Sequence, residues 1–446
     1  MGDQNRSTNN NENGKISSTF YIVFISLLLD LLAFTMILPL LPSLLEHYRQ
    51  NDTSGLYDWL LNKISYFQKF VGAPEQSSSV LFGGFLGSMF SFLQFVASPI
   101  LGGISDVKGR KGVMVCCLIG IAFSYILWAL SRNLVLFMVA RFIGGLCKGN
   151  VSLSMAIISD VSSVKTRGMG MALVGIAFSL GFIIGPLIGA IFAMSTPKIT
   201  GDWFVAPAIF AFFLSFVDLI FFAIFFQESL PKEKRSNDIW KSLRNAKALI
   251  DLRDLFWFQP VSDVKDHDLT KLRRLGVTYF VYLFIYSGLE FTLTFLTHHT
   301  FQYNSMQQGW MFFSIGLVMA IIQGSYVRRL PPHKITSTAV QGLWLIIPSF
   351  ICVGLARQLW TLYLGLLLFA VSTALVVPCM MTMASFYGSP QEKGTVMGIF
   401  RSIGALARAL GPIFASISFW ALGSTFTYLS GALALLCPVL LLKNKV

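Results

Sequence analysis

The stretch GMGMALVGIAFSLGFIIGPLIGAIFAM (residues 168–194) is 27 residues long and contains no charged side chain. About 20 apolar residues in an α-helix cross the ~30 Å hydrocarbon core of a bilayer, so the stretch predicts a membrane-spanning helix. Of the 446 residues, 54% are hydrophobic and only 12% are charged, whereas about a quarter are charged in a soluble domain. The strands of a membrane β-barrel alternate in polarity and are only ~10 residues long. The composition therefore predicts an all-α membrane protein.

Apolar runs between polar breaks predict twelve spanning helices. The first six cover residues 18–41, 78–104, 112–131, 134–158, 168–194 and 203–227, and the second six cover 276–299, 305–329, 335–356, 359–387, 395–420 and 423–442. A long hydrophilic segment separates the two sets. The predicted organisation is an N-terminal tail (1–17), a six-helix bundle (18–227), a linker with an interfacial helix (228–274), a second six-helix bundle (275–442) and a C-terminal tail (443–446).

The two predicted bundles repeat each other. When the second is moved back by 226 positions (411 − 185), Lys393-Gly394 falls on Arg167-Gly168. Without any gap, Gly411-Pro412 then falls on Gly185-Pro186. Internal repeats of this kind build transporters whose substrate site lies between the halves near the middle of the membrane. The sequence therefore predicts two pseudo-symmetric bundles.

The basic residues are unevenly distributed over the loops. Of the 34 Lys and Arg residues, 24 fall on one side of the predicted membrane and 6 on the other. Short cytoplasmic loops are enriched in Lys and Arg, so both termini are predicted to be cytosolic. This bias accounts for the net charge of +13 without nucleic acid. The first loop then faces outward, and its sequon Asn51-Asp52-Thr53 predicts glycosylation of Asn51. The sequence does not distinguish the plasma membrane from an internal membrane such as the nuclear or endoplasmic reticulum membrane.

The loop between the second and third predicted spans reads GGISDVKGRK (residues 102–111). It resembles the loop signature of the major facilitator superfamily at Gly102, Asp106, Gly109 and Arg110. The fifth span resembles the signature of the superfamily's antiporters at Gly181, Gly185, Pro186 and Gly189. Small residues four apart let helices pack closely. The hypothesis assigns a conformational role to both motifs, to the repeat at Gly411 and Pro412, and to Asp160 and Arg167, which flank the loop between the fourth and fifth spans.

The resemblance extends from residue 20 over nearly the whole chain. The first span looks like the opening helix of bacterial tetracycline/proton antiporters, and residues 144–154 and 388–412 resemble the animal tetracycline-transporter-like proteins. The resemblance implies a twelve-helix facilitator fold and a role in organic anion efflux, including some anti-inflammatory drugs.

Seven ionisable residues fall inside the predicted spans, where a charge costs several kcal/mol: Asp30, Arg141, Lys148, Asp218, Glu290, Arg401 and Arg408. At ~1.5 Å per residue, Asp30 and Arg141 lie ~18–19 Å from the cytosolic face, and Glu290 and Arg408 lie ~20 Å from it. We therefore predict two acid–base pairs, Asp30 with Arg141 and Glu290 with Arg408, as related sites of proton coupling. The alternative is that the pairs only fix helix packing. Asp218 is expected to be structural.

Two basic residues remain without an acid in this scheme. Lys148 and Arg401 are predicted to contact an anionic substrate, together with Arg141 and Arg408, because Arg can bind a carboxylate through two parallel hydrogen bonds. The alternative for Arg401 is a side chain that reaches the membrane surface.

The sequence thus predicts a secondary active transporter of a small organic anion or an amphipathic, drug-like solute, coupled to protons and acting as a monomer in the bilayer. Two alternative functions are compatible with the sequence: an uncoupled uniporter of organic anions, and a non-transporting sensor or membrane assembly partner. The sequence shows no phosphate-binding loop, and no cofactor is predicted. No metal site or enzymatic site is predicted either, because the five histidines lie in loops or at span ends.

Overall fold

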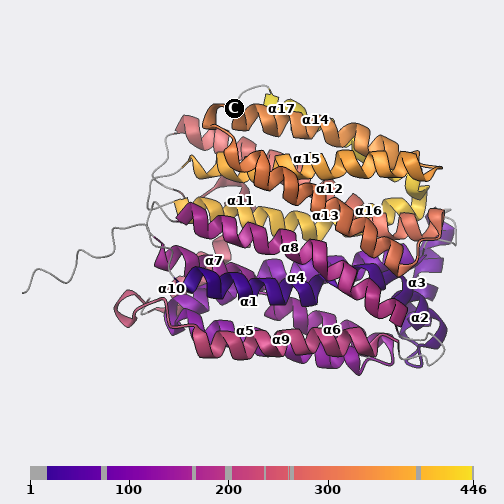
Figure 1. Ribbon diagram of the computed structural model, residues 1–446, viewed down its shortest axis with the longest axis horizontal. Helices are drawn as coiled ribbons and strands as arrows, with labels where there is room; N and C mark the ends of the chain where they lie inside the picture. Colours follow the sequence, from indigo (N-terminus) through magenta and orange to yellow (C-terminus); the bar gives the residue numbers. More distant parts are fainter. Residues whose placement is uncertain are drawn as a thin grey trace, which may run out of the picture.

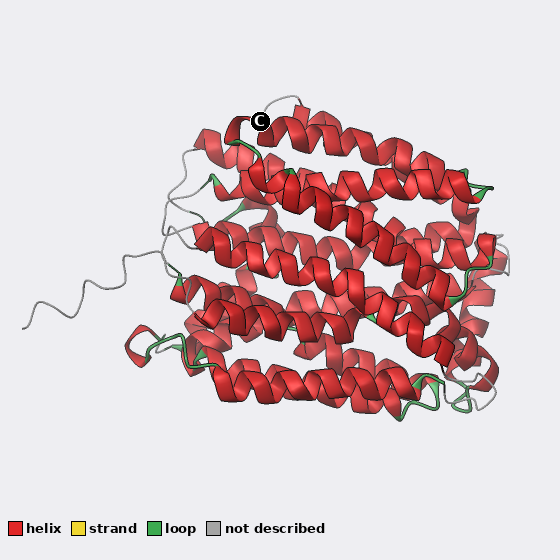
Figure 2. Ribbon diagram, viewed as in Figure 1, coloured by secondary structure: helices red, strands yellow, loops and turns green. Residues whose placement is uncertain are grey.

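The computed structural model describes residues 18–71, 78–162, 167–195, 203–235, 238–259, 261, 266–387 and 393–443. Within these ranges the regular structure is helical, without strands (Figure 2). The first bundle contains α1 (Ser18–Thr35), η1 (Leu38–Leu40), α2 (Leu41–Asn51), α3 (Leu56–Val71), α4 (Ser78–Lys108), α5 (Arg110–Ala129), α6 (Leu134–Cys147), α7 (Asn150–Val161), α8 (Arg167–Ser195) and α9 (Val205–Phe225). The second contains α12 (Asp266–Phe301), α13 (Ser305–Ser325), η5 (Val327–Arg329), η6 (Pro332–Lys334), α14 (Ile335–Gly354), α15 (Leu359–Ser385), α16 (Lys393–Ala434) and α17 (Leu436–Lys443).

The described residues contain eleven helical segments that are long and apolar enough to cross a membrane. The last of them, Val396–Lys443, has 48 residues. As one straight helix it would be ~72 Å long, more than twice the thickness of the hydrocarbon core. Gly423 breaks it with φ 83°, ψ 169°, a backbone conformation that glycine adopts readily. The segment therefore forms two passes, and the chain crosses the membrane twelve times.

Short helices connect the two bundles: η4 (Lys232–Lys234), α10 (Ile239–Ala248) and α11 (Leu252–Trp257). The side chain of Asp251 caps α11 by accepting hydrogen bonds from the N–H groups of Arg253 and Asp254. α10 packs on α4, whereas α11 packs on α12 and α16. α12 begins at Asp266, ten residues before the predicted span, because its polar first turns continue the helix beyond the apolar run.

The repeat found in the sequence is also a repeat of contacts. A side chain at Gly185 of α8 would collide with the hydroxyl of Thr35 and the carbonyl oxygen of Leu32 on α1. A side chain at Gly411 of α16 would collide in the same way with the hydroxyl of Ser287 and the carbonyl oxygen of Phe284 on α12. Thr35 in the first bundle thus corresponds to Ser287 in the second, and the two bundles are pseudo-symmetric in structure.

We call the end of the molecule at which α1 begins the first end, and the opposite end, which carries α2 and α3, the second end (Figure 1). The bundles meet where α4 packs on α16 and α8 packs on α13, which we call the seam. Glycines allow close approach on both sides of it. Gly84 of α4 abuts Ser416, and Gly309 of α13 abuts Ala190 of α8. These residues all lie in the halves of their helices nearer the second end.

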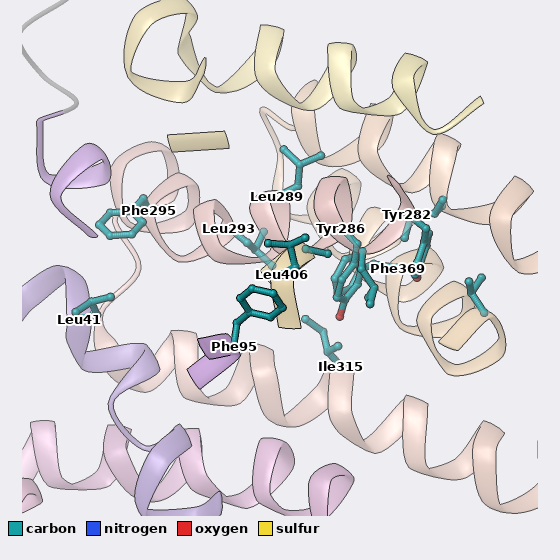
Figure 3. Close-up of a cluster of buried hydrophobic side chains, with 14 of the residues drawn as sticks. Leu41, Phe95, Tyr282, Tyr286, Leu289, Leu293, Phe295, Ile315, Phe369 and Leu406 are labelled. Atoms are coloured by element: carbon teal, nitrogen blue, oxygen red, sulfur yellow. The ribbon is translucent and has the colours of Figure 1, made fainter. Parts of the chain in front are cut away.

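The buried apolar residues reveal the same asymmetry. One cluster takes side chains from both bundles, including Phe95 of α4 with Leu293 of α12 and Leu406 of α16 (Figure 3). Toward the first end, the first bundle has a separate cluster of its own, which runs from Phe20 of α1 to Phe226 after α9. The described residues therefore pack the bundles together toward the second end and leave their cores separate toward the first.

Candidate functional site

A buried ion pair lies in the middle of the first bundle. Nζ of Lys148 is 2.7 Å from both carboxylate oxygens of Asp30, and the two side chains are 4% and 1% exposed. Asp30 lies on α1, and Lys148 follows the last residue of α6, where the helix breaks before Gly149. Burying two charges costs free energy that their mutual attraction offsets only when the geometry is good, as it is when the ammonium contacts both oxygens.

The predicted pairing of Asp30 with Arg141 is therefore wrong. Arg141 lies on α6 and Lys148 directly after it, seven residues further along, so the two lie near one face of the helix about two turns apart. The estimated depth in the membrane did not distinguish Arg141 from Lys148 as the partner of Asp30, because a long side chain can span most of the distance between the two positions. The guanidinium of Arg141 lies over the ring of Phe90 at 4.3 Å and that of Phe34 at 5.9 Å. No carboxylate among the described residues lies within ion-pair distance of it.

A small cavity opens beside the ion pair. Its lining includes the Phe34 and Phe90 rings, which stack at 5.2 Å, and the side chains of Tyr125, Arg141 and Lys148. The cavity has room for about one water molecule. Two basic groups and two aromatic faces thus converge on one enclosed point within the first bundle.

Glu290 of α12 has a different environment from Asp30. Its Oε1 accepts a hydrogen bond from the hydroxyl of Tyr286 at 2.8 Å. The Tyr286 ring stacks on Phe369 of α15 at 5.1 Å and on Tyr282 at 5.6 Å (Figure 3). The predicted ion pair of Glu290 with Arg408 is absent from the described residues, so that prediction is also wrong.

The predicted mirror relation between the two acids fails for a geometric reason. Since Thr35 corresponds to Ser287 (287 − 35 = 252), Asp30 corresponds to Tyr282 and Glu290 corresponds to Leu38. Glu290 therefore lies eight positions, or ~12 Å along the helix, beyond the counterpart of Asp30. The second bundle has a tyrosine where the first has its carboxylate.

Arg401 and Arg408 are seven residues apart on one face of α16. Between them Gly404 packs against Tyr279 and Leu283 of α12, so both arginines border α12. Nη1 of Arg401 is buried without a hydrogen-bond partner among the described residues, whereas the side chain of Arg408 is exposed. Neither guanidinium has a carboxylate within ion-pair distance in the described part of the chain.

The loop motif forms a charge network at the first end. The guanidinium of Arg110 contacts Asp106 at 2.6 Å and Asp160, at the end of α7, at 2.9 Å. The backbone at Gly109 has φ 99°, which favours glycine, while Gly102 has open space around it. Three of the predicted motif residues are thus brought together, and the side chain of Arg167 lies outside the described residues.

Sequence reasoning missed two members of this network. The carboxylate of Glu228 accepts hydrogen bonds from the N–H groups of Arg110 (2.8 Å) and Lys111 (3.2 Å) at the start of α5. Arg235 contacts Glu228 at 3.4 Å and donates to the carbonyl oxygen of Lys108 at 3.1 Å. An acidic residue directly after the sixth span, followed by a basic one, is the signal that could have identified them.

The small residues of α8 bring its backbone onto α1. Side chains at Gly181 and Gly189 would collide with Leu31 and with the carbonyl of Met36. The hydroxyl of Thr35 donates to the carbonyl oxygens of Leu31 (2.8 Å) and Gly181 (2.7 Å). This contact lies one to two turns beyond Asp30, next to Pro186, and so couples the antiporter-like motif to the helix that carries the buried acid.

Two pseudo-symmetric six-helix bundles, with ionisable side chains buried halfway through them and a seam toward one end, define a facilitator-type membrane transporter. The family model of the Major Facilitator Superfamily matches residues 23–412. The chain belongs to this superfamily.

Particular relatives share most of the chain. Major facilitator superfamily domain-containing protein 10 is 46% identical in Homo sapiens over 430 residues, which is 95% of this chain and 92% of that protein. The mouse protein is 45% identical over 428 residues. The crystal structure of the human organic anion transporter MFSD10 (TETRAN) has a TM-score of 0.80 at 45% identity and covers 95% of this chain and 99% of that one. A D-xylose–proton symporter at 14% identity and a TM-score of 0.69 shares the fold.

Proposed function

We propose that the chain carries a small organic anion across the membrane by alternating access, with proton coupling. The observation that carries the proposal is the set of arginines on the spanning helices, Arg141, Arg401 and Arg408, which have no carboxylate partner among the described residues. An uncompensated cation is costly in a membrane, and an anionic solute would neutralise it. The human relative of known structure is called an organic anion transporter, which supports the same substrate class.

The anion site that we propose spans both bundles. Arg401 and Arg408 offer guanidinium groups that can each bind a carboxylate through two parallel hydrogen bonds. Arg141 contributes from the first bundle, where the rings of Phe34 and Phe90 would pack on an aromatic or apolar part of the solute. Lys148 was predicted to contact the substrate, but its charge is neutralised by Asp30. It becomes available to the solute only when that pair separates.

The ion pair suggests how a proton would be coupled to the anion. When Asp30 binds a proton, Lys148 loses its partner and becomes a free cation near Arg141. Proton binding would therefore strengthen anion binding, and by thermodynamic linkage the anion would strengthen proton binding equally. This linkage favours movement of proton and anion in the same direction. The antiport implied by the motif of α8 requires that proton binding weaken anion binding. The sign of this linkage therefore distinguishes symport from antiport.

The excess of Lys and Arg on the loops of the first end supports a cytosolic location for both termini. In that orientation the seam would lie on the outer side, and we infer that the conformation is inward-open. Asn51, the last residue of α2, is exposed at the second end. This end would face outward in the proposed orientation, and Asn51 would then be glycosylated. When the protein is expressed in eukaryotic cells, glycosidase treatment should shift its electrophoretic band. Asn51→Gln should abolish that shift. A glycosidase-insensitive wild-type band would contradict the assignment.

Transport by purified protein in liposomes tests the proposal. Labelled organic anions and cations are offered with and without an imposed pH gradient, and we expect gradient-dependent uptake of anions only. Asp30→Asn should abolish the gradient dependence, whereas Asp58→Asn, an exposed aspartate on α3, should not. Anion uptake that is independent of the pH gradient would indicate a uniporter. The absence of uptake for every solute would favour a non-transporting protein.

A further inference from the structure

Asp218 of α9 is the second buried carboxyl group of the first bundle. Its residue exposure is 0%, and neither carboxylate oxygen has a hydrogen-bond partner among the described residues. α9 packs along α5 and α1, and its other buried residues include Ser215 and Phe222. Asp218 is therefore enclosed by protein and does not face lipid.

Few polar groups surround Asp218. The Ser26 hydroxyl of α1 lies beside it and is itself buried without a partner in the described residues. The charged groups that act on it are Asp30 of α1 and Lys148 after α6, and α5 brings no further charge into range in the described structure. Ser26 and Asp30 are four residues apart on α1 and so share one face of the helix. Ser26 therefore lies beside Asp218 and on the same face of α1 as Asp30.

The charges of this cluster do not balance if both acids are ionised. Lys148 contacts both oxygens of Asp30, which leaves Asp218 without a cation. An isolated carboxylate buried in a membrane is so costly that the group takes up a proton instead. A protonated carboxyl group has one O–H donor, and the unpartnered Ser26 oxygen is an acceptor for it.

We propose that Asp218 is a proton-binding site, occupied in the conformation seen here, which exchanges its proton with Asp30 through the Ser26 hydroxyl. The O–H bond of Asp218 breaks as its proton passes to the Ser26 oxygen, and the proton of Ser26 passes to Asp30. Ser26 ends unchanged, Asp30 is neutral and Asp218 is ionised, so one proton moves and the total charge is constant. Lys148 then loses its partner at Asp30 without any proton entering from water. The consequence for transport rests on the proposed proton coupling, whereas the occupied site does not.

Infrared spectroscopy of the purified full-length protein tests the site directly. The wild type should show the carbonyl stretch of a protonated carboxylic acid at neutral pH. Asp218→Asn, which replaces a neutral group by one of the same shape, should remove that band while the protein stays folded. Asp58→Asn, an exposed control on α3, should leave it unchanged, and Ser26→Ala should shift it. An infrared band of undiminished intensity in Asp218→Asn would overturn the site, and an unshifted band in Ser26→Ala would overturn the relay.

Transport separates this proposal from the proposed function. Asp218→Asn should flatten the pH dependence of anion uptake but leave the affinity for the anion unchanged, an outcome that a packing role would not produce. An unaltered pH profile would contradict the relay. If the wild type shows no proton-linked uptake while Asp218→Asn still removes the infrared band, the coupling fails and the proton site stands.

Discussion

The two bundles share one backbone contact and differ in the charges that they place next to it. Gly185 meets Thr35 in the first bundle as Gly411 meets Ser287 in the second. Beside this contact, the first bundle has a closed ion pair between Asp30 and Lys148. The second bundle has Tyr282 at the position of the acid, and the arginines of α16 have no carboxylate partner among the described residues. The difference teaches that a repeated scaffold can carry different charges in its two halves. Under the proposed function, the first bundle would hold the proton and the second the anion.

The largest effect should come from breaking the ion pair of the first bundle. Lys148→Ala leaves the carboxylate of Asp30 buried without its cation, and removal of one partner from a buried pair typically costs about 3–5 kcal/mol. The loss should appear as a lower Tm of the purified protein. Asp30→Asn combined with Lys148→Met should restore much of the stability but not the pH-dependent transport.

The exposed pair of Arg49 with Glu46 at the second end is the matched control. Arg49→Gln should change stability by at most about 1 kcal/mol, as is typical of surface ion pairs. Equal losses for Lys148→Ala and Arg49→Gln would show that the buried pair contributes little to stability and would remove the contrast between the bundles.

In the second bundle the expected effect is on binding instead of stability. Arg408→Gln removes a guanidinium that has no carboxylate partner to leave unpaired in the described structure, so Tm should change little. Hydrogen bonds to charged groups contribute about 1.5–3 kcal/mol, which corresponds to a ~10–100-fold weaker affinity for an anion. Arg408→Lys should recover part of that loss, because it keeps the charge but not the planar group. Arg357→Gln, an exposed arginine at the second end, is the control, and equal anion affinity in the Arg408→Gln protein and this control would sink the assignment.

The fold could be read from the sequence because its signals are long and redundant. Apolar runs of about 20 residues leave few alternatives, and the ungapped match of Gly185 with Gly411 identified corresponding helices. Even the break at Gly423 falls at the predicted boundary between the last two spans. The helix α3, by contrast, lies in a loop for which the sequence analysis predicted no element.

The sequence predicted which ionisable residues lie inside the membrane, but not which acid contacts which base. The seven intramembrane ionisable residues were identified, yet which cation meets Asp30 depends on a side chain that reaches across from the break after α6. Glu290 was matched to Asp30 because the two acids have similar estimated depths in the membrane, and a similar depth does not define the register of the two helices. Glu228 was missed because the helix that it caps begins 118 residues earlier in the chain, at Arg110, so the neighbours of Glu228 in the sequence do not identify its partner.

The seam offers a smaller but informative test, since it joins the bundles at one end only. Gly309→Val on α13 would drive a side chain into Ala190 of α8, whereas Gly324→Val on the same helix has open space around it. We expect Gly309→Val to increase the distance between spin labels at Asp58 and Gln302 of the second end, measured by pulsed electron resonance. Gly324→Val should leave it unchanged. Equal distances in both variants would mean that contact at Gly309 does not hold the second end closed.

The smallest expected effect lies in the loop after α2, outside the buried charges of both bundles. Burial raises the pKa of Asp52, but hydrogen bonds from the N–H groups of Tyr57 and Leu134 and from Ser54 outweigh it, and the net pKa lies below its ordinary value. A carboxyl group whose pKa is lowered by folding stabilises the protein above its unfolded pKa, and the contribution is lost as pH falls through the folded pKa. Asp52→Asn, which preserves the sequon, should therefore lower Tm slightly at neutral pH, by less than Lys148→Ala does. The difference from the wild type should vanish in acid, and a difference that persisted below the folded pKa would show that the side chain acts through its shape instead of its charge.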